Sequence, residues 1–206
     1  FLRKEMVQEP LAVQRFQQEA KAVARLSHPN IVGLYELATV RGQTFLILEY
    51  VDGIDLERLV HRHGLLPVSR ACQYVQQAAL GLQHAHEKGL IHRDLKPQNL
   101  LLSTRDNIVK ILDMGLARFT HNPEEATMVK GLTQEGAFMG TPDYVAPEQA
   151  LDPRKADARG DIYSLGCTLF FLLTGKPPFA GGTLAQKIAW HLHAAPPALA
   201  TFRDDV

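Results

Sequence analysis

Two polar segments of the chain carry side chains that could transfer a phosphoryl group. Asp94, Lys96 and Asn99 lie in the first segment, and Asp113 follows an apolar run further along. Carboxylate and amide oxygens suit Mg²⁺, and a lysine beside them suits the oxygen of a phosphate. Phosphoryl transfer needs a carboxylate that orients a hydroxyl, oxygen ligands for a metal and a cation for developing charge. This group of residues therefore predicts that reaction class.

These four residues can meet only if the chain between them turns back on itself. Apolar runs at 100–102 and 108–112 flank the polar stretch 103–107, which predicts a β-hairpin. A hairpin returns the chain to its start, so the segment before its first strand and the residue after its second strand should lie side by side. A helix predicted over 68–88 leads into the first segment.

The N-terminal part predicts one amphipathic helix and one hairpin. Apolar residues recur at helical spacing over 13–26, and Glu19 falls on their face. A carboxylate against apolar surface is costly alone, which predicts a cationic partner. The alternative is a half-exposed glutamate at the edge of the stripe. The β-rich segments 34–40 and 44–51 are separated by a Gly-containing turn, which predicts the hairpin.

The C-terminal half combines a long polar segment with one apolar helix. Residues 115–146 show scattered glycines and little periodicity, and loops of that length tend to be functional. Asp161 is expected to cap the apolar helix that ends at Gly175. The uncharged run 162–174 is shorter than the roughly 20 residues of a bilayer span, so we expect a buried core helix.

Composition excludes several classes of protein. The 206 residues are 46% hydrophobic and 21% charged, as in globular rather than disordered chains. The 22 basic residues balance 22 acidic ones, so nothing indicates a nucleic-acid binder. Cys72 and Cys167 lie far apart without zinc-ligand spacing, which favours a reducing, cytoplasmic setting. Because structured-looking sequence begins at Phe1, we expect a fragment.

The motifs together resemble those of a known family. Residues 92–99 read His-Arg-Asp-Leu-Lys-Pro-Gln-Asn, which resembles the catalytic loop of eukaryotic-type (Hanks-type) serine/threonine protein kinases. Residues 113–115 are similar to the metal-binding DFG element and 146–148 to the APE element, in the family's order. The polar segment between them corresponds to the activation loop. Residues 144–149 and 173–179 are similar to bacterial members of the family.

The resemblance implies a role for each matching residue. Asp94 would be the catalytic base, and Lys96 would steady the transferred γ-phosphate of ATP. Asn99 and Asp113 would hold Mg²⁺. Residues that would contact ATP or position it are Glu19 as the αC glutamate, Leu48 as the gatekeeper, Glu49 and Val51 through the hinge backbone, and Leu101 against adenine. Val23, Met114 and His92 would stack into the regulatory column between the lobes.

The resemblance also implies a two-lobed α+β fold with ATP in the cleft. Residues 1–51 would form a partial N-lobe with the αC helix, a hairpin and the hinge. Residues 52–206 would form a partial, mainly helical C-lobe with the catalytic loop, activation loop and core helix. No two of the 15 glycines are two residues apart, so the Gly-rich loop is absent. The β3 lysine is absent as well, since residues 1–4 resemble the stretch that follows it in the family. We expect both upstream of Phe1, with Lys4 as a substitute candidate for the lysine. Compared with the family pattern, we also expect the chain to lack the last C-lobe helices.

Regulation and partners follow from the same resemblance. Arg93 implies control by a phosphate on the activation loop, with Thr133 the first candidate site and Thr127 the second. Lys96 and the stretch around Thr141, a further regulatory candidate, resemble the serine/threonine branch. Protein substrates with Ser or Thr acceptors are expected, the resemblance allows self-phosphorylation in trans, and nucleic acid is not expected. Bacterial members often carry a membrane segment outside the kinase domain, which this chain does not show.

Two other functions remain as alternatives. A pseudokinase or scaffold would use the same fold for partner recognition, although the intact Asp94, Asn99 and Asp113 count against it. The isolated 206-residue chain is itself expected to be inactive and to fold poorly. A metal-binding protein could use the nine histidines, but histidines two apart on a helix, such as His84 and His86, face different sides.

Overall fold

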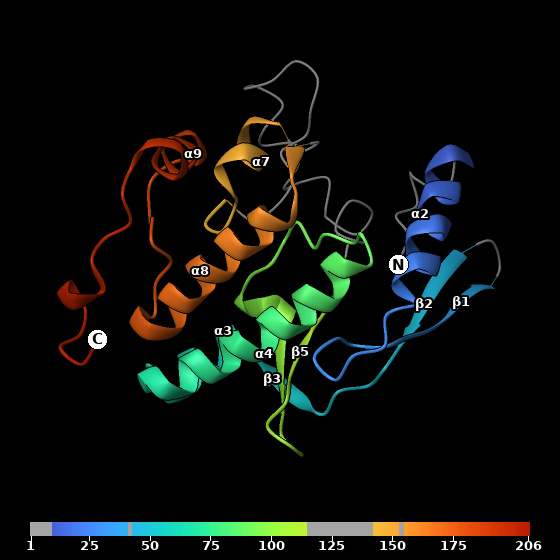
Figure 1. Cartoon of the computed structure of the whole chain (residues 1–206), viewed down its shortest axis with the longest axis horizontal. Helices are drawn as coiled ribbons and strands as arrows, with labels where there is room; N and C mark the ends of the chain where they lie inside the picture. Colours follow the sequence, from blue (N-terminus) through green and yellow to red (C-terminus); the bar gives the residue numbers. More distant parts are fainter. Residues whose placement is uncertain (1–9, 41–42, 115–141, 153–154) are drawn as a thin grey trace.

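The structure is a computed structural model that describes residues 10–40, 43–114, 142–152 and 155–206. Along the chain the elements are α2 (Pro10–Val23), β1 (Leu34–Val40), β2 (Gln43–Leu48), β3 (Gly53–Asp55), α3 (Leu56–His63), α4 (Val68–Glu87), η1 (Pro97–Asn99), β4 (Leu100–Ser103), β5 (Val109–Ile111), α7 (Pro147–Leu151), α8 (Ala158–Thr174), α9 (Leu184–His193) and η3 (Leu199–Thr201). Figure 1 shows α2, β1 and β2 at one side of the molecule and the longer helices at the other, which is the expected α+β arrangement.

The N-terminal part packs α2 beside an antiparallel hairpin. Phe16, Ala20 and Val23 are buried on one face of α2, as their spacing predicts. Strand β1 pairs with β2, and the register shifts between Leu34 and Glu36. Helix α2 contacts β1, and the buried residues of both belong to one hydrophobic cluster.

A second, three-stranded sheet has the order β3-β4-β5. The predicted hairpin is β4 and β5, with Leu100 opposite Ile111. The short strand β3 joins the outer edge of β4, with Ile54 opposite Leu102. This sheet lies next to α4, which contacts β5. It places the segment before β4 beside the residue that follows β5.

Helices α4 and α8 pack against each other in the centre of the larger part (Figure 1). The buried stripe of α4 includes Ala71, Ala78, Leu82 and Ala85, close to the predicted one. Gly81 lets α4 approach the chain closely, because a Cβ there would lie 2.8 Å from the backbone oxygen of Asn30. Helix α8 ends as predicted at Gly175, which adopts the left-handed conformation at φ 74°.

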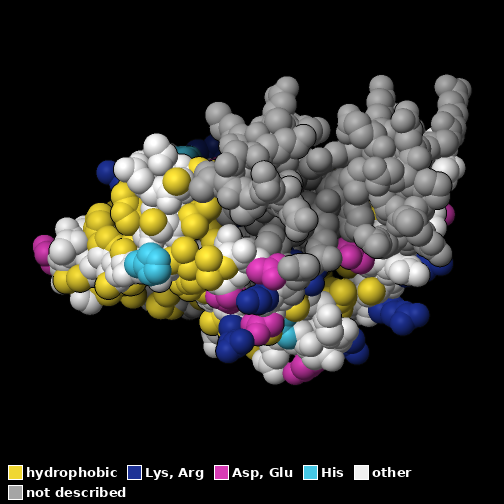
Figure 2. All heavy atoms as spheres, turned by 90° about the horizontal axis from the view of Figure 1, so that it is seen from above, with side chains coloured by type: hydrophobic (Ala, Val, Ile, Leu, Met, Phe, Trp, Pro, Cys, Tyr) yellow, Lys and Arg dark blue, Asp and Glu magenta, His cyan; other side chains and the backbone are white. Residues whose placement is uncertain are grey.

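The remaining helices lie on the C-terminal side. Helix α7 contacts both α8 and α9. Helix α9 begins with a capping box, in which Thr183 and Gln186 each bond the other's backbone. Figure 2 shows hydrophobic side chains gathered at the end of the molecule that carries α9 and the C-terminal segment, with charged side chains nearer the middle.

Backbone contacts join the two parts through the segment after α2. Ile31 forms a parallel bridge with Ile111 of β5, and the Val32 amide donates to the Ile111 carbonyl (2.9 Å). Core residues of α2, α4, β4, β5 and α8 belong to one hydrophobic cluster. The small sheet-bearing part and the helical part are thus packed into one body.

Candidate active site

The loop between α4 and β4 brings three of the predicted residues together. The Lys96 Nζ atom lies 3.0 Å from Oδ2 of Asp94. The Asn99 side-chain amide donates to the backbone carbonyl of Asp94 (2.7 Å), and its nitrogen lies 3.5 Å from the Asp94 carboxylate. Asp94 is buried, with 4% of its surface exposed. A cation and an amide therefore flank one desolvated carboxylate, where electrostatic interactions are stronger than in water.

Asp113 reaches the same place through the hairpin. The Leu112 amide donates to the Asn99 carbonyl (2.9 Å), so Asp113 lies beside the loop of residues 92–99, which we call the catalytic-type loop. Asp113 itself is exposed and adopts a left-handed backbone at φ 57°. The convergence expected from the hairpin is thus present in the backbone.

Hydrogen bonds fix the tautomer of His92. Its Nε2 atom lies 2.8 Å from the Leu112 carbonyl oxygen, which can only accept, so Nε2 carries the proton. Its Nδ1 atom accepts from the backbone amide of Asp94 (3.3 Å). His92 is fully buried. The ring thus links Leu112, next to Asp113, to the amide of Asp94.

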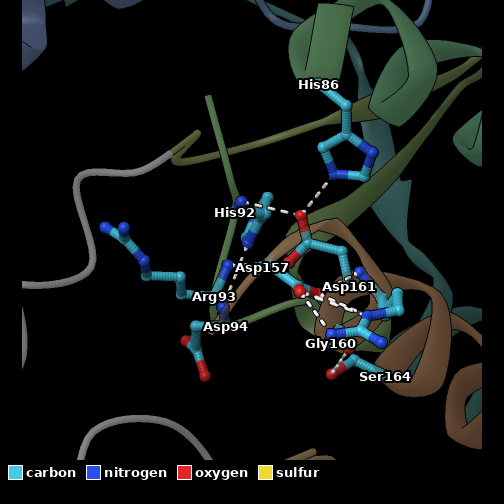
Figure 3. Close-up of polar contacts among 9 residues, drawn as sticks. His86, His92, Arg93, Asp94, Asp157, Gly160, Asp161 and Ser164 are labelled. Carbon is cyan, nitrogen blue, oxygen red and sulfur yellow. Dashed lines mark hydrogen bonds and ion pairs between the residues drawn. The ribbon is translucent and has the colours of Figure 1, made fainter. Parts of the chain in front are cut away.

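Asp161 lies beside the loop and bonds its backbone (Figure 3), and its expected role as a helix cap is wrong. Helix α8 begins three residues earlier, and Asp157 caps it by accepting from the Arg159 amide. The Asp161 carboxylate accepts instead from the backbone amides of His92 and Arg93 (2.8 Å each). It also accepts from Nε2 of His86 (2.7 Å).

The sequence did contain a signal for this role of Asp161. The residue stands inside an apolar helix and is 1% exposed. A buried carboxylate needs donors, and the helix's own backbone offers few there, so distant donors had to supply them. The donors proved to be 68 and 69 residues away in sequence.

The predicted Mg²⁺ ligands fit that metal by their chemistry. The Asn99 amide nitrogen is committed to the Asp94 carbonyl, which leaves the amide oxygen as the atom that could bind a cation. Asp113 supplies an exposed carboxylate. Among the described residues no three His, Cys, Asp or Glu side chains form a metal cluster. An amide oxygen and one carboxylate suit Mg²⁺, which is commonly held by one or two carboxylates together with substrate phosphates.

The predicted hinge follows β2, and its glutamate uses its side chain for structure. Leu48, Val51 and Leu101 are half-buried. Glu49 accepts from the Gly33 amide (3.1 Å) and pairs with Lys110 of β5 (2.8 Å). Burial raises the pKa of the Glu49 carboxyl, but the hydrogen bonds from Lys110 and Gly33 outweigh burial and lower it below its usual value. The segment after β2 is thereby tied to β5.

For the other predicted residues, the structure gives burial for three and does not describe four. Glu19 is half-buried on α2, beside the buried stripe. Val23 and Met114, expected in the column with His92, are buried in the same hydrophobic cluster. The residues that lie outside the described part of the chain are Lys4, Thr127, Thr133 and Thr141.

Comparison with known proteins places this geometry in a family. Residues 2–200 match the family described as Protein kinase domain. The chain is 40% identical over 199 residues to the serine/threonine-protein kinase PknB of Mycobacterium leprae, covering 95% of this chain and 31% of the relative. It is 37% identical over 208 residues to the serine/threonine-protein kinase pkn3 of Myxococcus xanthus, covering 99% and 37%. The chain thus spans about a third of the length of these relatives.

Solved structures agree. A mutant of the Mycobacterium tuberculosis PknI kinase domain superposes with a TM-score of 0.70 at 29% identity, covering 98% of this chain and 68% of that one. Rad53 in complex with AMP-PNP gives a TM-score of 0.67 at 30% identity, covering 84% of this chain and 41% of that one.

None of the helices in the described ranges is long and apolar enough to cross a membrane.

From the matching family and the similar relatives, the chain belongs to the protein kinase family, in its bacterial, Hanks-type serine/threonine branch.

Proposed function

We propose that the protein carrying this chain transfers the γ-phosphate of ATP to Ser or Thr hydroxyls of other proteins. The observation that carries this proposal is the buried Asp94 carboxylate with Lys96 3.0 Å away and the Asn99 amide bonded to its backbone. A carboxylate, a cation and an oxygen ligand at one place are the groups that phosphoryl transfer uses. The family and the Ser/Thr kinase relatives support the substrate class.

In this proposal each residue acts on a stated atom. Asp94 accepts the proton of the substrate hydroxyl while the hydroxyl oxygen bonds to the γ-phosphorus of ATP. The bond between that phosphorus and the oxygen that bridges the β- and γ-phosphates breaks, and ADP leaves. Lys96 offsets the charge that develops on the transferred group. Asn99 and Asp113 would hold Mg²⁺, which neutralises charge on the phosphates when bound.

ATP would lie against the segment after β2. The Glu49 carbonyl and the Val51 backbone would bond adenine, with Leu48 as gatekeeper and Leu101 under the ring. The Glu49 side chain supports this, because its bonds to Gly33 and Lys110 hold the segment in place. Glu19 would pair with a lysine that binds phosphate. Rad53, a neighbour in structure, was solved with AMP-PNP.

The remaining expectations belong to the proposal as well. We divide the chain into a partial N-lobe at 1–51 and a partial C-lobe at 52–206, and place this kinase part in the cytoplasm, where ATP and protein substrates meet. Arg93 would bind a phosphate on Thr133 or Thr127, and Thr141 would lie in the same regulated segment. The acceptor could be a second copy of the protein, phosphorylated in trans.

The test is phosphate transfer by the full-length protein. We would incubate it with Mg·ATP and a generic Ser/Thr substrate such as casein, beside Asp94→Asn, and locate phosphate by mass spectrometry. We expect transfer to fall about a hundredfold or more in Asp94→Asn, because the base is lost. Transfer from the intact protein to its own Asp94→Asn variant would show reaction in trans. Folded protein that transfers nothing would instead favour a pseudokinase scaffold.

A further inference from the structure

Gln149 of α7 contacts the loop that carries the candidate base. Its Nε2 atom donates to the backbone carbonyl of Arg93 at 2.6 Å, across 56 residues of sequence. Gln149 is 2% exposed, so this contact is made away from water. A short hydrogen bond between a buried side chain and a loop carbonyl restricts both partners strongly.

Arg93 is a residue that needs such restriction. Its φ of 68° lies in the left-handed region, which side chains other than glycine adopt at a cost. Backbone conformations of this kind persist only where the surroundings hold them. The Arg93 amide is held by Asp161 (2.8 Å) and its carbonyl by Gln149, so two different helices hold the two polar groups of one strained residue.

The carbonyl of Arg93 belongs to the peptide group that leads into Asp94. The nitrogen of that same group donates to Nδ1 of His92 (3.3 Å). A peptide group is planar, so fixing its oxygen and its N–H sets the plane from which the Asp94 side chain departs. Gln149 therefore acts on the orientation of the candidate base without touching a substrate.

Helix α7 is well placed to carry this side chain. It contacts α8 near Gly160, where an added Cβ would lie 3.4 Å from the Ala146 side chain and 3.4 Å from the Glu148 carboxylate. Gly160 lies at this contact, one residue before Asp161 in α8, so α7 packs against the turn of α8 that presents Asp161. The two groups that hold Arg93 are mounted on one packed pair of helices.

We propose that Gln149 is a positioning residue, which fixes the Arg93–Asp94 peptide and couples α7 to the catalytic-type loop. This inference rests on the proposed kinase function and adds a residue to it. The side chain at this position must donate, because its partner is a carbonyl oxygen, which only accepts. Gln149→Met keeps the size and removes the donor, whereas Gln149→Glu brings an accepting carboxylate to an accepting carbonyl.

The experiment compares these variants in the full-length protein with Thr168→Val. Thr168 is fully buried in α8 and donates to the Ser164 carbonyl (2.9 Å), so this control also removes one buried side-chain hydrogen bond. Steady-state kinetics with Mg·ATP would give kcat and the KM for ATP. Hydrogen exchange would follow the amides of residues 92–94, and thermal melting would report stability.

We expect kcat to fall about tenfold to a hundredfold in both Gln149 variants, because a misplaced base is costly, with the KM for ATP nearly unchanged. Exchange at 92–94 should accelerate in both and not in Thr168→Val, which should keep its kcat at a similar loss of Tm. If Gln149→Met does not fold, Gln149→Glu carries the test. Unchanged exchange and kcat in a folded Gln149 variant, or an equal fall of kcat in Thr168→Val, would overturn the inference.

The exchange arm separates this inference from the proposed function. If the wild-type protein transfers no phosphate, exchange still reports whether Gln149 holds the loop. Faster exchange in the Gln149 variants alone would then leave the positioning role standing and remove the kinase activity. If the wild-type protein is active and the Gln149 variants show unaltered exchange and kcat, the kinase function stands and the positioning role of Gln149 is overturned.

Discussion

At the level of single residues, the Asp161 carboxylate supports the catalytic-type loop by accepting three hydrogen bonds. Two come from consecutive backbone amides of the loop and one from His86. In a carboxylate both oxygens accept, whereas an asparagine offers one acceptor and one donor. In either orientation, the N–H groups of an asparagine at this position would face one of the two loop amides, so one hydrogen bond would be lost and a repulsion between donors added.

Asp161→Asn is therefore expected to lower kcat by about tenfold to a hundredfold through displacement of the loop. The free energy of unfolding should fall by about 1–3 kcal/mol, because buried donors lose their acceptor. Asp157→Asn is the matched control, since Asp157 caps the same helix from a more exposed position. Phosphate-transfer kinetics and urea unfolding of both variants test this, and equal kcat in the two variants would contradict it.

The two cysteines differ in a way that alkylation can measure. Cys72 is exposed, whereas Cys167 is buried in α8. Burial raises the pKa of the Cys167 thiol to about 12, so little reactive thiolate forms at pH 8. We expect iodoacetamide to modify Cys72 and spare Cys167 in the folded protein, with both modified in urea. Peptide mass spectrometry reads the sites, and equal rates in the folded protein would show that α8 opens readily.

At the level of elements, the periodicity of apolar residues predicted those helices and hairpins whose form depends on the local sequence. The stripes of α2 and α4 and both hairpins are confirmed, because burying one face dictates the spacing of apolar residues. The three-residue strand β3 was missed, since its pairing with β4 joins segments far apart in sequence. The role of Asp161 was missed for the same reason. Motif residues of the loop could be found from sequence. The acidic Asp161 inside an apolar helix indicated that it needs donors, but the sequence did not indicate that the loop amides supply them.

The ion pair between the segment after β2 and strand β5 predicts a pH dependence. The folded-state pKa of Glu49 lies below its usual value of 4.5. The pair thus adds stability above that pH, and the contribution is lost as the pH falls through the lower folded-state value. Lys110→Met should lower the free energy of unfolding by up to about 1 kcal/mol at pH 7.

Urea unfolding at pH 7 and pH 3 measures this difference. The difference in the free energy of unfolding between wild type and Lys110→Met should narrow at the lower pH, because Glu49 becomes protonated as the pH falls and the ion pair with Lys110 is lost. The exposed Lys88 provides a control, and Lys88→Met should show no such narrowing. A gap that stays constant with pH would mean that Lys110 contributes by packing of its aliphatic stem and not by its charge.

At the level of the whole molecule, the two parts are joined by a buried amide and the backbone around it. The Asn30 side chain donates to the Val109 carbonyl (2.8 Å) and to the Gln77 side chain (3.2 Å). The backbone carbonyl of Asn30 accepts from the Ile111 amide (2.9 Å). His28, two residues earlier, stacks on His84 of α4 with ring centroids 5.2 Å apart. The segment after α2 is thus bonded at once to α4 and to β5.

Asn30→Leu keeps the size of the side chain and removes both of its hydrogen bonds. Because Asn30 is 6% exposed, water cannot readily replace them, and we expect the free energy of unfolding to fall by about 1–3 kcal/mol. Gln83→Leu is the control, since Gln83 is an exposed amide on α4 and should change stability by less than about 0.5 kcal/mol. Hydrogen exchange should accelerate at 31–32 and 109–111 while α9 is unaffected. Acceleration spread evenly over the chain would show that Asn30 supports the whole core and does not specifically join its two parts.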